Sequence, residues 1–178
     1  MALRNILTDK DSFLRKTSRE VVDFDERIHT LLDDMRDTLL VANGVGLAAP
    51  QVGILRRAVL VMDISRQGLT PGQQIIELLN PEIIAQEGEQ EGYEGCLSIP
   101  GKIGIVKRPM WVKVRAVDRN GKPFETEGRG MTARAMCHEL DHLDGVLYTD
   151  IAFQVMDESE LELQEESDAA ADEADESI

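Results

Sequence analysis

Aromatic residues and cysteines are scarce in this chain of 178 residues. Phe, Trp and Tyr together make up 4% of the sequence, so aliphatic side chains and methionine must fill most of its core. The two cysteines, Cys96 and Cys137, are too few for the disulfide framework of a small secreted protein. Each is better interpreted as a metal ligand, a nucleophile or a buried thiol.

Long hydrophobic runs are also absent. No stretch approaches the roughly 20 apolar residues that cross a membrane. The N-terminal residues lead into the charged Asp9, Lys10 and Asp11, where a signal peptide would have its apolar run. We therefore expect a cytoplasmic protein that does not enter a membrane. A chain of this length suits one domain with a substantial core.

Basic residues are missing from the C-terminal segment. Residues 157–178 hold eleven of the 34 acidic residues and no Lys or Arg, which leaves 23 acids against 19 bases, or a net charge of −4, in the rest. Neither part has the basic patch of a nucleic-acid-binding protein, so we expect no sequence-specific binding to nucleic acid. We predict one domain over residues 1–156 and an acidic low-complexity tail over residues 157–178, disordered or partly helical.

The apolar pattern predicts an α+β fold, with mostly antiparallel strands around a central helix and a further helix near the N-terminus. The N-terminal helix is expected to begin at residues 23–26 and to end near Asn43 and Gly44. The central helix is expected over residues 131–143, and residues 44–53 are expected to form a tight loop. Strands are predicted at residues 58–62, 75–79, 83–84, 112–117 and 123–127, with a break at Pro81 and a hairpin turn at Asn120-Gly121.

The central helix carries an H-E-x-x-H motif over residues 138–142. His138 and His142 are four residues apart, so they lie on one face of a helix and can bind one metal ion. Glu139 is placed to act as a general base on a metal-bound water. The alternative is a surface helix with two histidines, but the neighbouring Met136 indicates burial, and burying such polar groups without a metal is costly.

A catalytic metal site usually has three protein ligands, and the motif supplies two. Downstream, residues 143–156 offer only Asp144 and Asp150, so the third ligand is expected upstream. Cys96 is the best candidate, although a free cysteine alone is more often a small buried hydrophobe. Cys137 is interpreted as a core or pocket residue, because its side chain leaves the helix roughly 100° away from that of His138.

Three segments together resemble the signature of the peptide deformylase family. They are Gly-Val-Gly-Leu-Ala-Ala-Pro-Gln at residues 44–51, Glu-Gly-Cys-Leu-Ser at residues 94–98 and His-Glu-Leu-Asp-His at residues 138–142. The resemblance extends over roughly residues 3–155 and leaves out the tail. It implies that residues 1–156 form a catalytic metallohydrolase domain. The implied reaction removes the formyl group from the N-terminal formyl-methionine of nascent polypeptides and releases formate.

The resemblance also implies roles for individual residues. Cys96, His138 and His142 correspond to the ligands of one divalent metal ion, which is Fe(II) in the cell, whereas Zn(II), Ni(II) or Co(II) can replace it in a purified sample. Glu139 corresponds to the catalytic glutamate. The side-chain amide of Gln51 and the backbone N–H of Leu97 correspond to groups that face the reacting carbonyl.

Substrate-binding residues are expected in all three segments. Gly44, Val45, Gly46 and Gly95 are expected along the extended peptide. By their positions on the helix, Met131, Ala135 and Met136 are expected walls of a pocket for the substrate methionine, with ordinary core as an equal alternative.

The chain departs from the family pattern in three places. Many members have Gln at the position of Cys137, and some bacterial members have Arg at that of Ile103. Others end in a basic helix that docks on the ribosome, whereas residues 157–178 are acidic and would be repelled by RNA. Docking through such a helix is therefore not carried over, and a transient contact with the ribosome stays open.

Two other functions are alternatives to a deformylase. A different small zinc peptidase would leave Gln51 and Cys96 without a role. A non-catalytic, metal-stabilised binding module would have no need for a general base such as Glu139.

Overall fold

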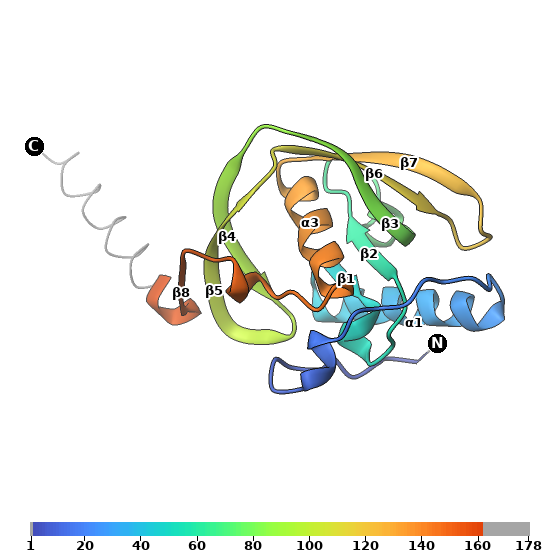
Figure 1. The fold of residues 1–178 in the computed structure, drawn as a ribbon, viewed down its shortest axis with the longest axis horizontal. Helices are drawn as coiled ribbons and strands as arrows, with labels where there is room; N and C mark the ends of the chain where they lie inside the picture. Colours follow the sequence, from blue (N-terminus) through green and yellow to red (C-terminus); the bar gives the residue numbers. More distant parts are fainter. Residues whose placement is uncertain (1, 162–178) are drawn as a thin grey trace, which may run out of the picture.

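Helix α3 (Met131–Leu143) runs through the middle of the fold, where it packs on a five-stranded sheet and also contacts a three-stranded sheet (Figure 1). The computed structural model describes residues 2–161. All pairings between named strands are antiparallel, in the orders β1-β2-β3-β6-β7 and β4-β5-β8. The predicted α+β class is confirmed.

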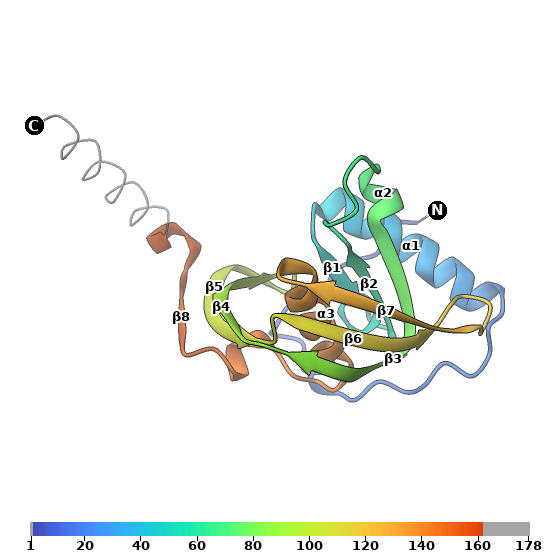
Figure 2. The ribbon, with the colours of Figure 1, turned by 90° about the horizontal axis from the view of Figure 1, so that it is seen from above.

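The strands of the two sheets and the helices are interspersed along the chain. In order, they are η1 (Ser12–Arg15), α1 (Glu26–Ala42), β1 (Gly46–Ala48), η2 (Ala49–Val52), β2 (Ala58–Met62), α2 (Pro71–Gln74), β3 (Ile75–Glu87), β4 (Gln90–Cys96), β5 (Ile99–Arg108), β6 (Trp111–Val117), β7 (Pro123–Arg129), α3, η3 (Tyr148–Asp150) and β8 (Gln154–Asp157). Figure 2 shows the strands of the larger sheet from above.

Helix α1 has the boundaries that its sequence predicts. The Asp25 carboxylate accepts hydrogen bonds from the backbone N–H groups of Arg27 and Ile28, and so caps the first turn. The helix ends at Asn43, whose φ of 53° is left-handed. Its apolar side chains pack beneath β2 in a cluster with residues of β1 and η2; from α1 they are Ile28, Leu31, Leu32, Met35 and Leu39.

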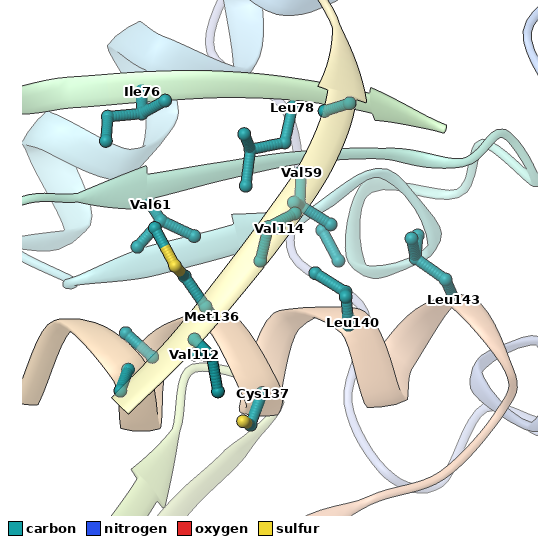
Figure 3. Close-up of a cluster of buried hydrophobic side chains, with 14 residues drawn as sticks. Val59, Val61, Ile76, Leu78, Val112, Val114, Met136, Cys137, Leu140 and Leu143 are labelled. Carbon is teal, nitrogen blue, oxygen red and sulfur yellow. The ribbon is translucent and has the colours of Figure 1, made fainter. Parts of the chain in front are cut away.

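A second core cluster lies between α3 and the five-stranded sheet (Figure 3). Met136, Leu140 and Leu143 point from the helix toward the sheet. The sheet contributes mainly aliphatic side chains, among them Val59, Val61, Ile76, Leu78, Val112 and Val114. An aliphatic core, expected from the scarcity of aromatic residues, therefore holds the H-E-x-x-H helix in place.

The expected break at Pro81 is wrong, because β3 continues through it. The strand accommodates the proline at a shift of register between Leu79 and Glu82. Next to it, Asn80 has a φ of 49°, and its side-chain amide both donates to and accepts from the backbone of Val21. The N-terminal segment thus provides hydrogen-bond partners for Asn80 in the irregular part of the strand.

The chain between residues 44 and 53 is more regular than a loop. It forms the short strand β1 followed by the 3-10 helix η2. The hairpin of β4 and β5 was not predicted, because Gly and Glu interrupt any apolar alternation in β4. The expected tail begins beside β8, and from residue 162 it lies outside the described residues. Within residues 2–161, no helix is long and apolar enough to cross a membrane.

Glu77 joins three elements on the face of β3 that α1 covers. Its carboxylate accepts from Arg36 of α1 at 2.9 Å and from Arg119, in the turn after β6, at 2.9 Å. Burial raises the pKa of Glu77, but the hydrogen bonds from Arg119 and Arg36 outweigh it, and the pKa lies below its ordinary value of 4.5. The charged form therefore stabilises the fold.

We expect Glu77→Gln to lower the free energy of unfolding at pH 7 by about 1–3 kcal/mol, because it weakens hydrogen bonds between charged groups. Since the pKa is lowered in the folded state, this contribution is fully present above pH 4.5 and is lost as the pH falls below it. Urea unfolding at several pH values measures the difference. The exposed Glu82 of the same strand supplies the control Glu82→Gln. A wild-type advantage that stays constant down to pH 3 contradicts the assignment.

Candidate active site

Cys96, His138 and His142 meet at the buried end of a cavity. Each offers one ligand atom, and these three atoms all lie within 4.8 Å of one another. Cys96 ends β4, and both histidines come from α3, so the two sheets must be in place for the cluster to exist. Cys96 Sγ is 3.4 Å from His142 Nε2. Among the residues that the structure describes, no other group of His, Cys, Asp and Glu forms such a cluster.

The imidazole of His138 is held in its orientation by Glu94 and Tyr148. Its Nδ1 lies 2.9 Å from Glu94 Oε2, so Nδ1 carries the proton and Nε2 is left to face the cluster. The Tyr148 ring stacks on the imidazole at a centroid distance of 6.0 Å, and the Tyr148 hydroxyl donates to the backbone carbonyl of Lys102.

Glu94 is itself held by two buried arginines. Arg108 donates to both carboxylate oxygens, at 2.8 and 3.0 Å, and Arg134 donates to Oε1 at 3.0 Å. Burial raises the pKa of Glu94, but the hydrogen bonds from His138 and Arg108 outweigh it and lower the pKa to about 2. Burial lowers the pKa of His142 to about 3. The pocket thus holds an ionised carboxylate and a neutral imidazole, which is the form that binds a metal.

Glu139 lies beside the cluster with an unused oxygen. The side chain is buried, and its Oε2 has no hydrogen-bond partner within residues 2–161. Burial raises its pKa to about 7. Gly46 of β1 makes room for this carboxylate, since a Cβ at that position would lie 2.3 Å from Glu139 Oε1 and 2.6 Å from its Cγ.

Gln51 reaches the cluster from η2. Its Oε1 accepts from the Ala48 N–H at 2.8 Å, and its Nε2 donates to Ser98 Oγ at 3.1 Å and to Cys96 Sγ at 3.5 Å. Leu97, next to Cys96, lines the same cavity. The structure thus brings Gln51 and Leu97 together with Glu139, as the sequence predicts.

A cavity of about 560 Å³ opens in front of these groups. Its walls contain most of the residues predicted to bind the substrate, namely Gly44, Val45, Gly46, Gly95, Met131 and Ala135. Met136 is the exception. It is fully buried in the core cluster, points from α3 toward the five-stranded sheet (Figure 3) and does not line the cavity, so its interpretation as a pocket wall is corrected to core.

Several residues of the opposite wall had no predicted role. They belong to the hairpin of β4 and β5 and to the start of the C-terminal segment: Tyr93, Ile99, Lys102, Ile103 and Glu158. No sequence pattern indicated the hairpin that carries most of them. Cys137 is buried in the core cluster, and burial raises its pKa to about 11, which fits a packed thiol.

A cysteine thiol, two imidazoles and an unpaired carboxyl group at a cavity are typical of a metal-dependent hydrolase. Comparison with known proteins identifies the family within this class. Residues 3–157 match the family model of polypeptide deformylase. The chain therefore belongs to the polypeptide deformylase family.

Curated relatives and solved structures agree. The chain is 59% identical to a peptide deformylase of Lachnoclostridium phytofermentans, over 84% of this chain and 89% of the relative. It is 53% identical to that of Acetivibrio thermocellus, over 94% of each chain. A peptide deformylase structure from Legionella pneumophila matches with a TM-score of 0.78 and 44% identity, covering 84% of this chain and 86% of the other. That from Thermotoga maritima matches with a TM-score of 0.78 and 34% identity, covering 86% and 100%.

The protein is thus an enzyme that removes the formyl group from the N-terminal formyl-methionine of nascent polypeptides and releases formate. The resemblance carried by the three motifs is confirmed, and a different peptidase or a non-catalytic module is set aside. Metal dependence belongs to the family, and the buried cluster is a candidate site for the ion.

We expect Gly46→Ala to retain the fold and to lower kcat about 100-fold, because the added methyl group must displace the Glu139 carboxylate. Gly72→Ala is the matched control, since a Cβ there meets only Leu40, at 3.8 Å. Formate release and thermal melting of both variants test this expectation. Wild-type kcat in a folded Gly46→Ala would show that the position of Glu139 is not critical.

Proposed function

We propose that Cys96, His138 and His142 hold one divalent metal ion, which is Fe(II) in the cell. Thiolate and imidazole ligands suit Fe(II), and Zn(II), Ni(II) or Co(II) would fit the same donors in a purified sample. The fit is supported by the ligand atoms that lie within 4.8 Å of one another and by the tautomer that Glu94 imposes on His138. When bound, the ion supplies a Lewis acid and lowers the pKa of a bound water.

Glu139 is proposed as the catalytic acid and base, and its buried, unpartnered oxygen is the observation that carries this assignment. The carboxylate takes the proton of the attacking water and delivers it to the amine that leaves when the C–N bond of the formamide breaks. The oxygen of that water remains in formate. Gly46 keeps the carboxylate free of steric contact, and no cation binds it within residues 2–161.

Gln51 and Leu97 are proposed to stabilise the oxygen of the formyl group as negative charge develops on it. Gln51 Oε1 accepts a hydrogen bond from the Ala48 N–H at 2.8 Å, which fixes the direction of the amide. Leu97 contributes its backbone N–H. Donors that are fixed before the reaction stabilise such charge effectively, because they need no reorganisation.

The substrate is proposed to bind as an extended strand along β1 and the residues just before it. β1 forms one edge of the five-stranded sheet, so Val45 and Gly46 have backbone groups on the side away from β2, and Gly44 lies next to them in the cavity wall. Gly95 lies on the opposite wall. The methionine side chain is proposed to enter the apolar part of the cavity beside Met131 and Ala135, without Met136.

Nascent polypeptides as substrates place the proposed reaction in the cytoplasm, and we propose residues 1–156 as the catalytic domain. A transient contact with the ribosome stays a prediction, as does the absence of sequence-specific binding to nucleic acid.

The two cysteines provide a matched test of the metal site. We expect Cys96→Ala to lower bound metal well below one ion per chain, because the site loses one of three ligands. Cys137→Ala removes a thiol that lies in the core and is expected to keep full metal content at some cost in stability. Metal analysis after anaerobic loading and desalting measures both. Full occupancy in Cys96→Ala would exclude Cys96 as a ligand.

The activity is tested by formate release from formyl-Met-Ala-Ser after anaerobic loading with Fe(II). Glu139→Gln keeps the size of the side chain but removes the base, and we expect it to bind metal normally and to lose 10²–10⁴-fold in kcat. Wild-type protein that binds metal but releases no formate would overturn the proposal. A mutant that retains wild-type kcat would overturn only the role of Glu139.

A further inference from the structure

Ser98 is fully buried two residues after the proposed metal ligand Cys96, and its hydroxyl faces another group of the site. Ser98 Oγ accepts from Gln51 Nε2 at 3.1 Å, and the Ser98 backbone N–H points to Cys96 Sγ at 3.4 Å. Within residues 2–161, Gln51 is the only hydrogen-bond partner of this hydroxyl. Neither the proposed mechanism nor the metal cluster uses it so far.

The hydrogen bonds of Gln51 determine what the hydroxyl does. Gln51 Oε1 is occupied by the Ala48 N–H at 2.8 Å, which sets the direction of the amide and turns Nε2 toward the cluster. Nε2 carries two protons. One bonds to Ser98 Oγ, and the other points to Cys96 Sγ at the long distance of 3.5 Å.

We propose that Ser98 is a positioning residue that holds one Gln51 proton, so that the other is presented to the formyl oxygen. In the free enzyme this second proton faces the Cys96 sulfur, whose charge the proposed metal ion shares, so that the sulfur accepts more weakly than an oxygen anion does. When charge develops on the substrate oxygen, the proton turns to that stronger acceptor while the first bond keeps the amide in place. The inference rests on the proposed role of Gln51 and adds the group that orients it.

If Ser98 were only structural, Ser98→Ala would change the stability of the segment but not the behaviour of the Gln51 amide. The Ser98 carbonyl accepts from the Asp9 N–H at 2.8 Å, and its own N–H points to Cys96, but both are backbone contacts that Ser98→Ala retains. The substitution removes only the hydroxyl from a buried site. The effect on Gln51 is therefore separable from the packing of the segment.

Ser98→Ala is expected to lower kcat about five- to tenfold with little change in KM, because a neutral hydrogen bond that acts in the transition state is lost. Ser65→Ala, which removes an exposed hydroxyl that does not line the cavity, is the control and keeps wild-type kcat. If Ser98→Ala does not fold, Ser98→Cys, which is close in volume and a weaker acceptor, takes its place in every measurement.

A double-mutant cycle with Gln51→Ala shows whether Ser98 acts through Gln51. We expect the loss of kcat caused by Ser98→Ala to disappear in the Gln51→Ala background. A readout independent of activity is the solvent exchange of the Gln51 side-chain amide protons by NMR of ¹⁵N-labelled protein, which is expected to accelerate in Ser98→Ala. Additive losses, or unchanged exchange, would overturn the inference. Absence of formate release by the wild type would instead overturn the proposed function.

Discussion

The hydrogen bond between His138 Nδ1 and Glu94 Oε2 joins the helix of the site to the strand that carries Cys96. It turns the second imidazole nitrogen toward the cluster, and it exists only when β4 lies against α3. Burying the Glu94 carboxylate would be costly if it stood alone. Arg108 and Arg134 offset that cost, and Arg108 also bonds Asp141 of the same helix. A polar network, rather than apolar contact alone, thus sets the distance between the two halves of the proposed metal site.

The apolar parts of the fold serve this network by holding α3 at a fixed height above the five-stranded sheet. Met136 and Leu140 fill the space between the helix and that sheet (Figure 3), whereas His138 and His142 contact Glu94 and Cys96 of the three-stranded sheet. At the edge of the larger sheet, Gly46 leaves the volume that Glu139 occupies. The short strand β1 therefore leaves room for Glu139, the proposed base, and has a free edge to which an extended peptide could pair.

The parts of this arrangement that depend on local patterns could be predicted from the sequence. The spacing of His138 and His142 and the start of α1 within residues 23–26 are of this kind, because a helix alone determines them. The passage of β3 through Pro81 could not be predicted, since it depends on a bulge satisfied by a distant segment. Whether Met136 faces the cavity or the core could not be predicted either, because that depends on how α3 is rotated against the sheet. The pairing of Glu94 with two arginines likewise arises only once the sheets are assembled.

The distribution of charge explains how two buried glutamates near one cluster serve different purposes. Both arginines of the site bond Glu94, which lowers its pKa to about 2 and makes it a permanent acceptor for His138. Glu139 has no cationic partner among the described residues, and burial raises its pKa to about 7. A carboxylate committed to an arginine is a poor proton carrier, whereas one left unpaired in a buried site can accept and return a proton near neutral pH. Because Glu94 takes both arginines, Glu139 stays free for proton transfer, and one network sets both the metal ligand and the base.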